Sequence, residues 1–188
     1  CIADQFCKRF SEELGKLSPG DPSDDATGVP PMSSQSAADQ INKQVEEAVK
    51  NGAKAHRVGP TPPNQGAFVQ TTILTDLTRE NPAFYQEFFG PVALFFTVKD
   101  EQEAIALAND TPYGLGGSVF TQNTKRGVEV AKQIYTGMVY INHPTWTKPD
   151  LPFGGVKRSG YGRALAMLGI EEFINKKLIN VVPIDAPA

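Results

Sequence analysis

One segment of this sequence places a carboxylate and aromatic side chains beside a Gly-Pro turn, a combination suited to binding a small ligand. It is the run from Gln86 to Pro91, in which Glu87 and Phe89 precede the turn. A carboxylate held there can accept a hydrogen bond from a ligand hydroxyl. The alternative is an ordinary turn whose aromatic residues enter the core, and the residues alone leave both interpretations open.

A second segment, from Asn142 to Lys148, holds the single tryptophan, Trp146, and one of the two histidines, His143. It follows a predicted strand, and loops after strand ends in α/β sheets are common ligand sites. A lone histidine in such a loop is more often structural than catalytic. The run 109–117 also joins a helix to a strand, and turn formation alone explains its residues.

A third segment, from Pro152 to Arg163, holds four glycines and three cationic side chains within twelve residues. Open backbone N–H groups and positive charge are what a phosphate-binding loop needs. The segment is not a Walker A sequence, and its glycine spacing differs from the dinucleotide-binding fingerprint. A close approach between two backbone segments would explain the glycines equally well.

The two cysteines, Cys1 and Cys7, are candidate nucleophiles. A cysteine nucleophile needs a lowered pKa, which a helix N-terminus or a cationic neighbour provides. Cys1 lies at the start of a predicted helix but also at a chain end, and Cys7 lies beside Lys8 and Arg9 with no base nearby in sequence. Neither is predicted to be catalytic, although a cysteine-dependent hydrolase built on one of them remains a third possibility. The spacing excludes a disulfide framework and predicts no zinc site.

Helical and strand patterns alternate along the chain and predict the scaffold that carries these segments. Ile2, Phe6, Phe10 and Leu14 recur at helical spacing from the first residues, with no room for an N-cap. Helices are predicted over 2–17, 34–50, 100–108, 124–135 and 165–173, with a helical turn at 82–86 and strands over 53–58, 68–74, 92–98, 115–120, 137–141 and 178–182. Ser33 or Ser34 is the expected N-cap of the helix over 34–50, and Asp100 that of the helix over 100–108. The order predicts an α/β fold, with a largely parallel sheet covered by helices.

Four motifs follow one another along the chain: Glu87-Phe88-Phe89-Gly90-Pro91-Val92, Ala108-Asn109-Asp110-Thr111-Pro112-Tyr113-Gly114-Leu115, Gly137-Met138-Val139-Tyr140-Ile141-Asn142 and the run from Pro152 to Arg163. Together, in this order and at this spacing, they resemble the aldehyde dehydrogenase superfamily. The resemblance spans essentially the whole chain. The runs Asn142-His143-Pro144-Thr145-Trp146 and Asp150-Leu151-Pro152-Phe153 are most similar to the succinate-semialdehyde dehydrogenase-like branch.

The resemblance implies an oxidoreductase that converts an aldehyde to a carboxylic acid with NAD or NADP. It implies that Glu87 hydrogen-bonds the nicotinamide ribose and that Phe89 packs beside the nicotinamide. Trp146 and Phe153 would line an apolar substrate pocket that limits water, and Asn142 would support the pocket floor.

A substrate carboxylate would need a polar or cationic partner in the same region. Lys148, Thr145 and Thr147 are the candidates, on their charge and position. These assignments would suit succinate semialdehyde as the aldehyde.

The resemblance also predicts that the chain is part of a longer enzyme. The family's nucleophilic cysteine, in a Gly-Gln-x-Cys motif, and its general-base glutamate are expected upstream of residue 1, so no catalytic residue is predicted in this chain. In the complete enzyme a thiolate attacks the aldehyde carbon to form a thiohemiacetal, hydride passes to NAD⁺ or NADP⁺, and an activated water releases the acid. The resemblance also places a Rossmann-like domain upstream, which would hold most of the cofactor, and the chain alone is expected to be inactive.

Residues 1–175 are predicted to form the catalytic domain without its nucleophile segment, and residues 176–188 a C-terminal oligomerisation strand and tail. Leu178 to Val182 would add a strand to a neighbour's sheet, giving a homodimer or homotetramer. An alternative function is an inactive assembly or interaction module that uses the same strand. One departure from the family is Ala164, in place of the usual glutamate, which is expected to leave Arg163 without its partner.

Composition and charge limit the classes of partner and the cellular location that the sequence predicts. The 188 residues include 18 Lys and Arg against 21 Asp and Glu, a net charge of −3, so no strong basic field exists to hold nucleic acid. No apolar run approaches the ~20 residues of a membrane helix, and no signal-peptide leader precedes the first helix. The expected protein is cytoplasmic and acts on a small aldehyde, with no metal, nucleic-acid or membrane partner.

Overall fold

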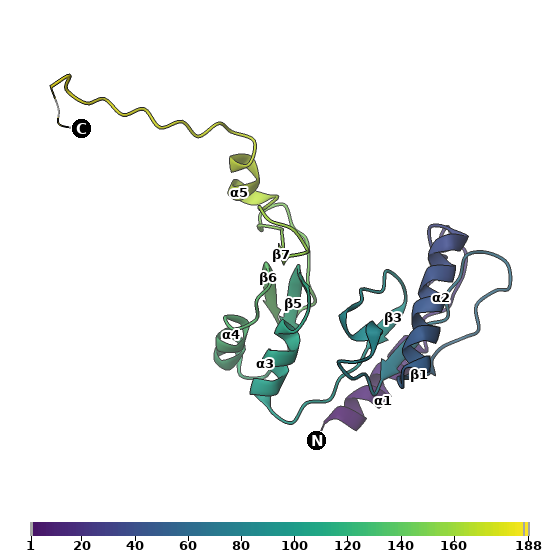
Figure 1. Cartoon of the computed structure of the whole chain (residues 1–188). Helices are drawn as coiled ribbons and strands as arrows, with labels where there is room; N and C mark the ends of the chain where they lie inside the picture. The colour runs from purple at the N-terminus through teal and green to yellow at the C-terminus, as the bar shows by residue number, and fades with distance from the viewer. Residues whose placement is uncertain (1, 186, 188) are drawn as a thin grey trace. The chain divides into compact units, whose positions relative to one another are not determined.

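The computed structural model describes residues 2–185 and 187, and the chain divides into two compact units, Cys1–Lys99 and Asp100–Ala188. Figure 1 traces the chain and labels many of its helices and strands. The predicted boundary after residue 175 stays a prediction.

The first unit packs helices against a small mixed sheet. Its elements are α1 (Ala3–Leu14), α2 (Gln35–Lys50), β1 (Lys54–Arg57), β2 (Thr72–Thr75), the 3₁₀ turn η1 (Pro82–Tyr85) and β3 (Val92–Leu94). The sheet order is β1-β2-β3, with β1 antiparallel and β3 parallel to β2. In register, Lys54 pairs with Thr75 and Thr72 pairs with Val92.

Helix α2 forms where the sequence predicts it, for the expected reasons. Ser34 is the N-cap, and its side chain accepts a hydrogen bond from the backbone N–H of Ala37. Ile41, Val45 and Ala48 follow at four- and three-residue spacing and are all buried, so one face of the helix enters the core.

Helix α1 is shorter than predicted. It ends at Leu14 instead of Leu17, and the next backbone N–H groups donate to carbonyls three residues back, from Lys16 to Glu13 and from Leu17 to Leu14. Such three-residue bonds tighten the last turn of a helix and end its regular ladder. As expected, no side chain caps its N-terminus at Ile2.

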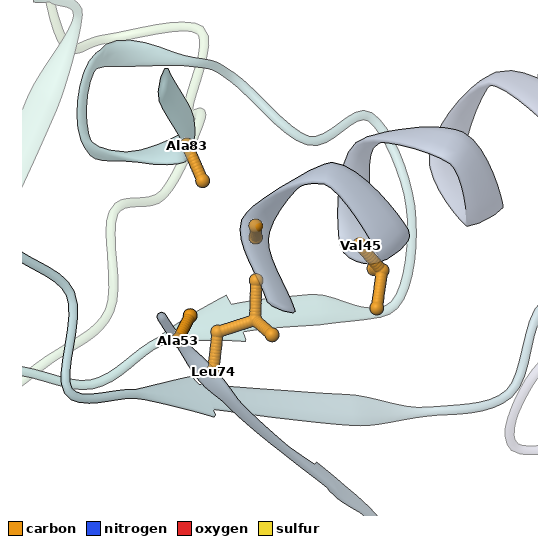
Figure 2. Packing of buried hydrophobic residues seen from close by; sticks show 5 residues of the cluster. Val45, Ala53, Leu74 and Ala83 are labelled. Carbon is orange, nitrogen blue, oxygen red and sulfur yellow. The ribbon is translucent and has the colours of Figure 1, made fainter. Parts of the chain in front are cut away.

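The core of the first unit is built around Leu74, which is fully buried on β2. Figure 2 shows its side chain pointing toward α2, with Val45, Ala53 and Ala83 around it. Burying a leucine of this kind contributes about 1.5–3 kcal/mol. We call this group, together with Ala48, the Leu74 cluster. A neighbouring Ile41 cluster consists of Ile41, Ala38 and Val69.

Asn81 is a buried polar residue that joins η1 to the end of α2. Its side-chain Nδ2 donates to the carbonyls of Ala48 at 2.8 Å and Asn51 at 3.2 Å, and its Oδ1 accepts from the N–H of Ala83 at 3.0 Å. The amide therefore binds two carbonyl groups at the C-terminus of α2, where the Ala48 carbonyl also accepts from the N–H of Ala53.

The second unit carries short strands and helices. Its elements are α3 (Glu101–Asn109), β4 (Tyr113–Gly114), β5 (Gly116–Val119), α4 (Thr124–Ala131), β6 (Met138–Ile141), β7 (Val156–Lys157) and α5 (Ala166–Glu171). Strands β5 and β6 are parallel, with Gly116 opposite Met138, while β4 and β7 are antiparallel. Asp100 caps α3 as predicted, because its side chain accepts from the N–H of Glu103.

The prediction of a largely parallel sheet is correct for two strand pairs and wrong for the rest. β2–β3 and β5–β6 are parallel, but β1–β2 and β4–β7 are antiparallel, and in the described part of the chain the strands fall into separate small sheets. The strand predicted over 92–98 ends at Leu94 and is half-buried rather than buried on both faces. The N–H of Phe95 still donates to the carbonyl of Leu74, and β2 itself ends one residue later at Thr75.

The strand predicted over 178–182 is not formed in the structure. After α5 the described chain runs on as an extended trace (Figure 1), and Leu178 is 89% exposed. A strand needs a neighbour to take up its backbone hydrogen bonds, and no described residue is assigned to a strand after β7. Among the residues described, no helix is long and apolar enough to cross a membrane.

Candidate functional site

The turn of residues 86–91 divides its aromatic side chains between core and solvent. Phe88 packs against both the Leu74 and the Ile41 clusters, whereas Phe89 is 76% exposed. Leaving a phenylalanine in water forgoes about 1.5–3 kcal/mol of burial. The core interpretation therefore holds for Phe88, whereas Phe89 is left exposed, and its contact with a ligand stays a prediction.

Glu87 lies between these two aromatic residues with its carboxylate exposed. Its backbone carbonyl accepts a hydrogen bond from Gln44 Nε2 of α2 at 3.4 Å. Gly90 keeps the same turn close to α2, because a Cβ there would lie 3.2 Å from Ile41 Cγ1. An acceptor carboxylate and an uncovered ring on one anchored turn fit the hydroxyls of a ribose and a flat heteroaromatic ring.

In the second unit, Asn142 turns the chain at the end of β6. Its φ of 56° lies in the left-handed region, which asparagine tolerates better than most residues. Its side-chain Nδ2 donates to the Thr121 carbonyl at 2.8 Å, and its Oδ1 accepts from the Thr121 N–H at 2.7 Å. Its backbone N–H donates to the carbonyl of Val119. Asn142 thus fixes the base of the following loop; its contact with a substrate pocket stays a prediction.

Three aromatic rings contact one another here, Tyr140 on β6 and His143 and Trp146 in the loop that follows. The Tyr140 and His143 rings have centroids 6.0 Å apart, and the His143 and Trp146 rings meet edge-to-face at 5.9 Å. The Tyr140 hydroxyl donates to the Trp146 backbone carbonyl at 2.8 Å. Trp146 remains 52% exposed, so half of the indole is available to a ligand. His143 has a structural partner here, since its Nδ1 is 2.7 Å from the Pro144 carbonyl oxygen.

The candidate partners of a substrate carboxylate lie on the same loop. Thr145 rests on β5, where a Cβ at Gly116 would come within 2.7 Å of Thr145 Cγ2. Thr147 and Lys148 are exposed, and the Lys148 carbonyl accepts from the N–H of Leu151. Their contact with a carboxylate stays a prediction.

Phe153 lies in the glycine-rich segment, bridged to Ala164 by two backbone hydrogen bonds of 2.8 and 2.7 Å. It lines an open cavity of about 380 Å³ together with Leu115, Tyr161 and Phe173. Apolar walls of this kind suit an aldehyde chain more than a phosphate.

Two of the three cations in the glycine-rich segment, Lys157 and Arg163, bind backbone carbonyls of the protein itself. Lys157 Nζ donates to the carbonyls of Asn109 at 2.8 Å and Thr111 at 3.0 Å, at the C-terminus of α3, and lies 5.6 Å from the Tyr135 ring centroid. A cation in this position stabilises a helix C-terminus. A Cβ at Gly137 would collide with the Gly154 carbonyl. A Cβ at Gly154 would lie 2.6 Å from the Gly162 carbonyl oxygen, whereas one at Gly160 would meet nothing within 4 Å. Gly154 therefore serves a close backbone approach, and the described contacts do not support the phosphate-loop interpretation.

The expectation that Ala164 leaves Arg163 without a partner is wrong. Arg163 Nη1 donates to the carbonyls of Gly155 at 2.9 Å and Gly162 at 2.6 Å, and the Arg163 backbone N–H donates to Glu172 Oε1 at 3.2 Å. Carbonyl oxygens take the place of the missing carboxylate, and a more distant glutamate binds the backbone beside them.

Cys7 is half-buried on α1, where its carbonyl accepts a hydrogen bond from Ser11 Oγ. Cys1 lies outside the described residues. Within the described part of the chain, no group of three or more His, Cys, Asp or Glu side chains could hold a metal ion.

Sequence patterns did not reveal two asparagines that hold these elements together, Asn81 in the first unit and Asn109 in the second. Asn109 Nδ2 donates to the Gln133 carbonyl at 2.8 Å, and its Oδ1 accepts from the Tyr135 N–H at 2.7 Å. The segment 109–117 was expected only to form a turn. An asparagine at each of these turns is the signal that could have suggested an amide binding backbone groups.

Comparison with known proteins defines the class to which this fold and these motifs belong. A model described as the aldehyde dehydrogenase family matches residues 1–179. The succinate-semialdehyde dehydrogenase (NADP(+)) of Deinococcus radiodurans is 48% identical over 182 residues, which cover 97% of this chain and 38% of that protein. The chain belongs to the aldehyde dehydrogenase family, as the motif resemblance predicts.

Solved structures agree with this assignment. A succinic semialdehyde dehydrogenase from Streptococcus pyogenes in complex with NADP⁺ matches 95% of this chain and 40% of its own, with a TM-score of 0.86 and 43% identity. A salicylaldehyde dehydrogenase from Pseudomonas putida G7, complexed with salicylaldehyde, matches all of this chain and 38% of its own, with a TM-score of 0.88 and 34% identity. The chain therefore spans about two fifths of the length of these relatives.

Proposed function

We propose that this chain forms the substrate-pocket and nicotinamide-contacting part of an NADP-dependent succinate-semialdehyde dehydrogenase. The observation that carries the proposal is the 48% identity, along 97% of the chain, to a Deinococcus radiodurans protein with that name and cofactor. The nucleophilic cysteine and the general base are proposed to lie outside these 188 residues. The two-fifths share of the relatives' length supports this division.

The first unit contributes the cofactor contacts. Phe89 packs its exposed ring beside the nicotinamide, and the Glu87 carboxylate accepts a hydrogen bond from a ribose hydroxyl. When bound, the cofactor supplies the acceptor for the hydride that leaves the aldehyde carbon. Because the half-buried Phe88 packs against both core clusters, the turn presents both groups in one fixed orientation.

The second unit contributes the aldehyde pocket. Trp146 and Phe153 supply apolar walls that limit water, and Asn142 fixes the base of the loop that carries Trp146. Lys148, with Thr145 or Thr147, binds the carboxylate of the semialdehyde. A cation and hydroxyl donors suit a carboxylate, which is an acceptor-only group when ionised.

The enzyme reaction gives the direct test. The native protein is expected to reduce NADP⁺ with succinate semialdehyde, and to use an uncharged aldehyde of the same length with a higher KM. The 188-residue chain assayed alone is expected to show no turnover. Turnover by the chain alone that is lost in Cys1→Ser would overturn the placement of the nucleophile, and native protein inactive with every aldehyde would overturn the function.

A second candidate function is an assembly module that acts through the C-terminal segment. Ile174, Leu178, Ile179, Val181 and Val182 are all exposed there, although such side chains are normally buried. Residues 178–182 would add a strand to the sheet of a second copy and so form a homodimer or homotetramer. Light scattering tests this: deleting 178–182 is expected to lower the measured mass of the native protein, whereas an unchanged monomer before and after would reject the module.

A further inference from the structure

The loop of residues 143–147, here called the Trp146 loop, is held in place by contacts that the sequence motifs do not reveal. It leaves β6 at Asn142, whose amide binds Thr121, and it reaches a further contact where the N–H of Ala166 donates to the carbonyl of Pro149. These contacts fix only the two ends of the segment. Trp146 lies between them and needs its own restraints.

Tyr140 provides one restraint. Its hydroxyl donates to the Trp146 carbonyl at 2.8 Å, across six residues of chain, from a strand that is itself paired with β5. The bond therefore ties the middle of the loop to the sheet. The centroid of the His143 ring lies within 6.0 Å of the centroids of both the Tyr140 and Trp146 rings. The tyrosine that makes this hydrogen bond and the indole therefore belong to one aromatic cluster.

Gly116 provides the second restraint, from β5. A Cβ at this position would lie 2.7 Å from Thr145 Cγ2 and 2.9 Å from Thr145 Oγ1. Contacts this short do not occur, so the absence of a side chain at Gly116 lets the residue before Trp146 sit directly on the strand. The φ of Gly116 is not in the left-handed region, so the constraint is one of space.

We propose that Tyr140 and Gly116 are positioning residues that together hold Trp146 at one place on the substrate pocket and so set the affinity for the aldehyde. The proposal rests on the proposed function, in which Trp146 lines that pocket. A half-exposed tryptophan on a loop fixed at its middle gives a rigid wall, whereas a free loop would lose entropy on every binding event.

The single tryptophan of the chain reports on its own position, independently of activity. Tyr140→Phe keeps the ring and removes the hydroxyl, so acrylamide quenching of Trp146 fluorescence in the 188-residue chain is expected to rise about twofold as the loop loosens. Tyr135→Phe is the matched control, because the ring facing Lys157 is kept and the quenching is expected to stay at the wild-type value. Equal quenching in Tyr140→Phe and wild type would overturn the proposal.

Gly116→Ala tests the second restraint by a size rescue. The added methyl group is expected to displace Thr145 and increase quenching of Trp146, and Thr145→Ala in the same chain is expected to restore the wild-type value by removing the two colliding atoms. If the quenching of Trp146 stays raised when Thr145→Ala is added to Gly116→Ala, Gly116 acts through β5 alone. That result would overturn its role in positioning Trp146. Circular dichroism of each variant shows whether it folds. If Gly116→Ala alone does not fold, the double variant Gly116→Ala with Thr145→Ala decides whether Gly116 makes room for Thr145.

Kinetics of the native protein complete the test. Tyr140→Phe is expected to raise the KM for succinate semialdehyde about fivefold, while kcat and the KM for NADP⁺ stay within about twofold. An equal loss of kcat and kcat/KM, or a change in the NADP⁺ KM, would contradict a positioning role. If the wild-type enzyme does not oxidise the semialdehyde, the proposed function fails, and the fluorescence results still decide whether Tyr140 and Gly116 hold Trp146.

Discussion

The turn of residues 86–91 and the Trp146 loop both present an aromatic side chain to solvent, but different forces hold them. The turn is anchored by apolar packing, since Phe88 enters two buried clusters and Gly90 lies on Ile41. The loop is anchored by polar groups, chiefly the Asn142 amide and the Tyr140 hydroxyl. The stability of the first unit and the position of Phe89 should therefore change together, whereas the loop can move while its unit stays folded.

Truncating Phe88 should have the largest effect on stability. Phe88→Ala removes a half-buried ring that packs against both clusters, so we expect the free energy of unfolding to fall by about 2–3 kcal/mol. Phe89→Ala is the matched control, because that ring is already in water and its loss should cost less than about 0.5 kcal/mol. Urea unfolding of the two variants makes the comparison. Equal losses would show that the turn is not anchored through Phe88.

Changing Asn142 should have a smaller effect, confined to the second unit. Asn142→Ala removes two side-chain hydrogen bonds to Thr121, for an expected loss of about 2 kcal/mol. Asn142→Gly loses the same bonds but accepts the positive φ more easily, so it should be about 1 kcal/mol more stable than Asn142→Ala. Hydrogen exchange of amides in β5 and β6 localises the change. An equal increase in exchange in the first unit would show that the effect of Asn142 is not confined to the second unit.

The smallest effect that we predict is on the pH dependence of stability, and it concerns Glu80, at the turn that precedes η1 in the first unit. A hydrogen bond from the Thr78 side chain, and next its own backbone N–H, hold the pKa of Glu80 below 4.5. A carboxyl group with a lowered pKa stabilises the fold above its ordinary pKa, and the contribution is lost as the pH falls below about 4.5 and through the lowered pKa.

Unfolding of wild type and Glu80→Gln across this pH range measures the contribution. The wild type should lose slightly more stability than the variant on acidification, and the effect should be small because the group is fully exposed. A variant that loses more stability than wild type would reverse the sign and refute the assignment.

The sequence predicts local elements well where neighbouring residues determine them. Ser34 and Asp100 are N-caps as expected, and the spacing of Ile41, Val45 and Ala48 predicts the buried face of α2. Sheet pairing was predicted less well, because partners such as Phe153 and Ala164 meet through a chain reversal that periodicity does not encode. The bonds of Asn81 to residues thirty or more positions earlier are long-range contacts of the same kind.

In the candidate site, too, the contacts of individual side chains could not be predicted from the sequence. Motif resemblance predicts which residues matter, but two adjacent aromatic residues give no sign of which is buried, and the structure assigns the core to Phe88 and the surface to Phe89. The acceptors of Arg163 were also missed, because backbone carbonyls are available at every position and leave no signal in the sequence.

In the proposed enzyme, the turn of residues 86–91 binds the cofactor and the Trp146 loop binds the aldehyde. Steady-state kinetics of the native protein with both substrates varied tests it most directly, in Phe89→Ala and Trp146→Ala. We predict that Phe89→Ala raises the KM for NADP⁺ and leaves that for succinate semialdehyde within about twofold, and that Trp146→Ala does the reverse. Two variants that raise the same KM would contradict the division of roles between the two regions.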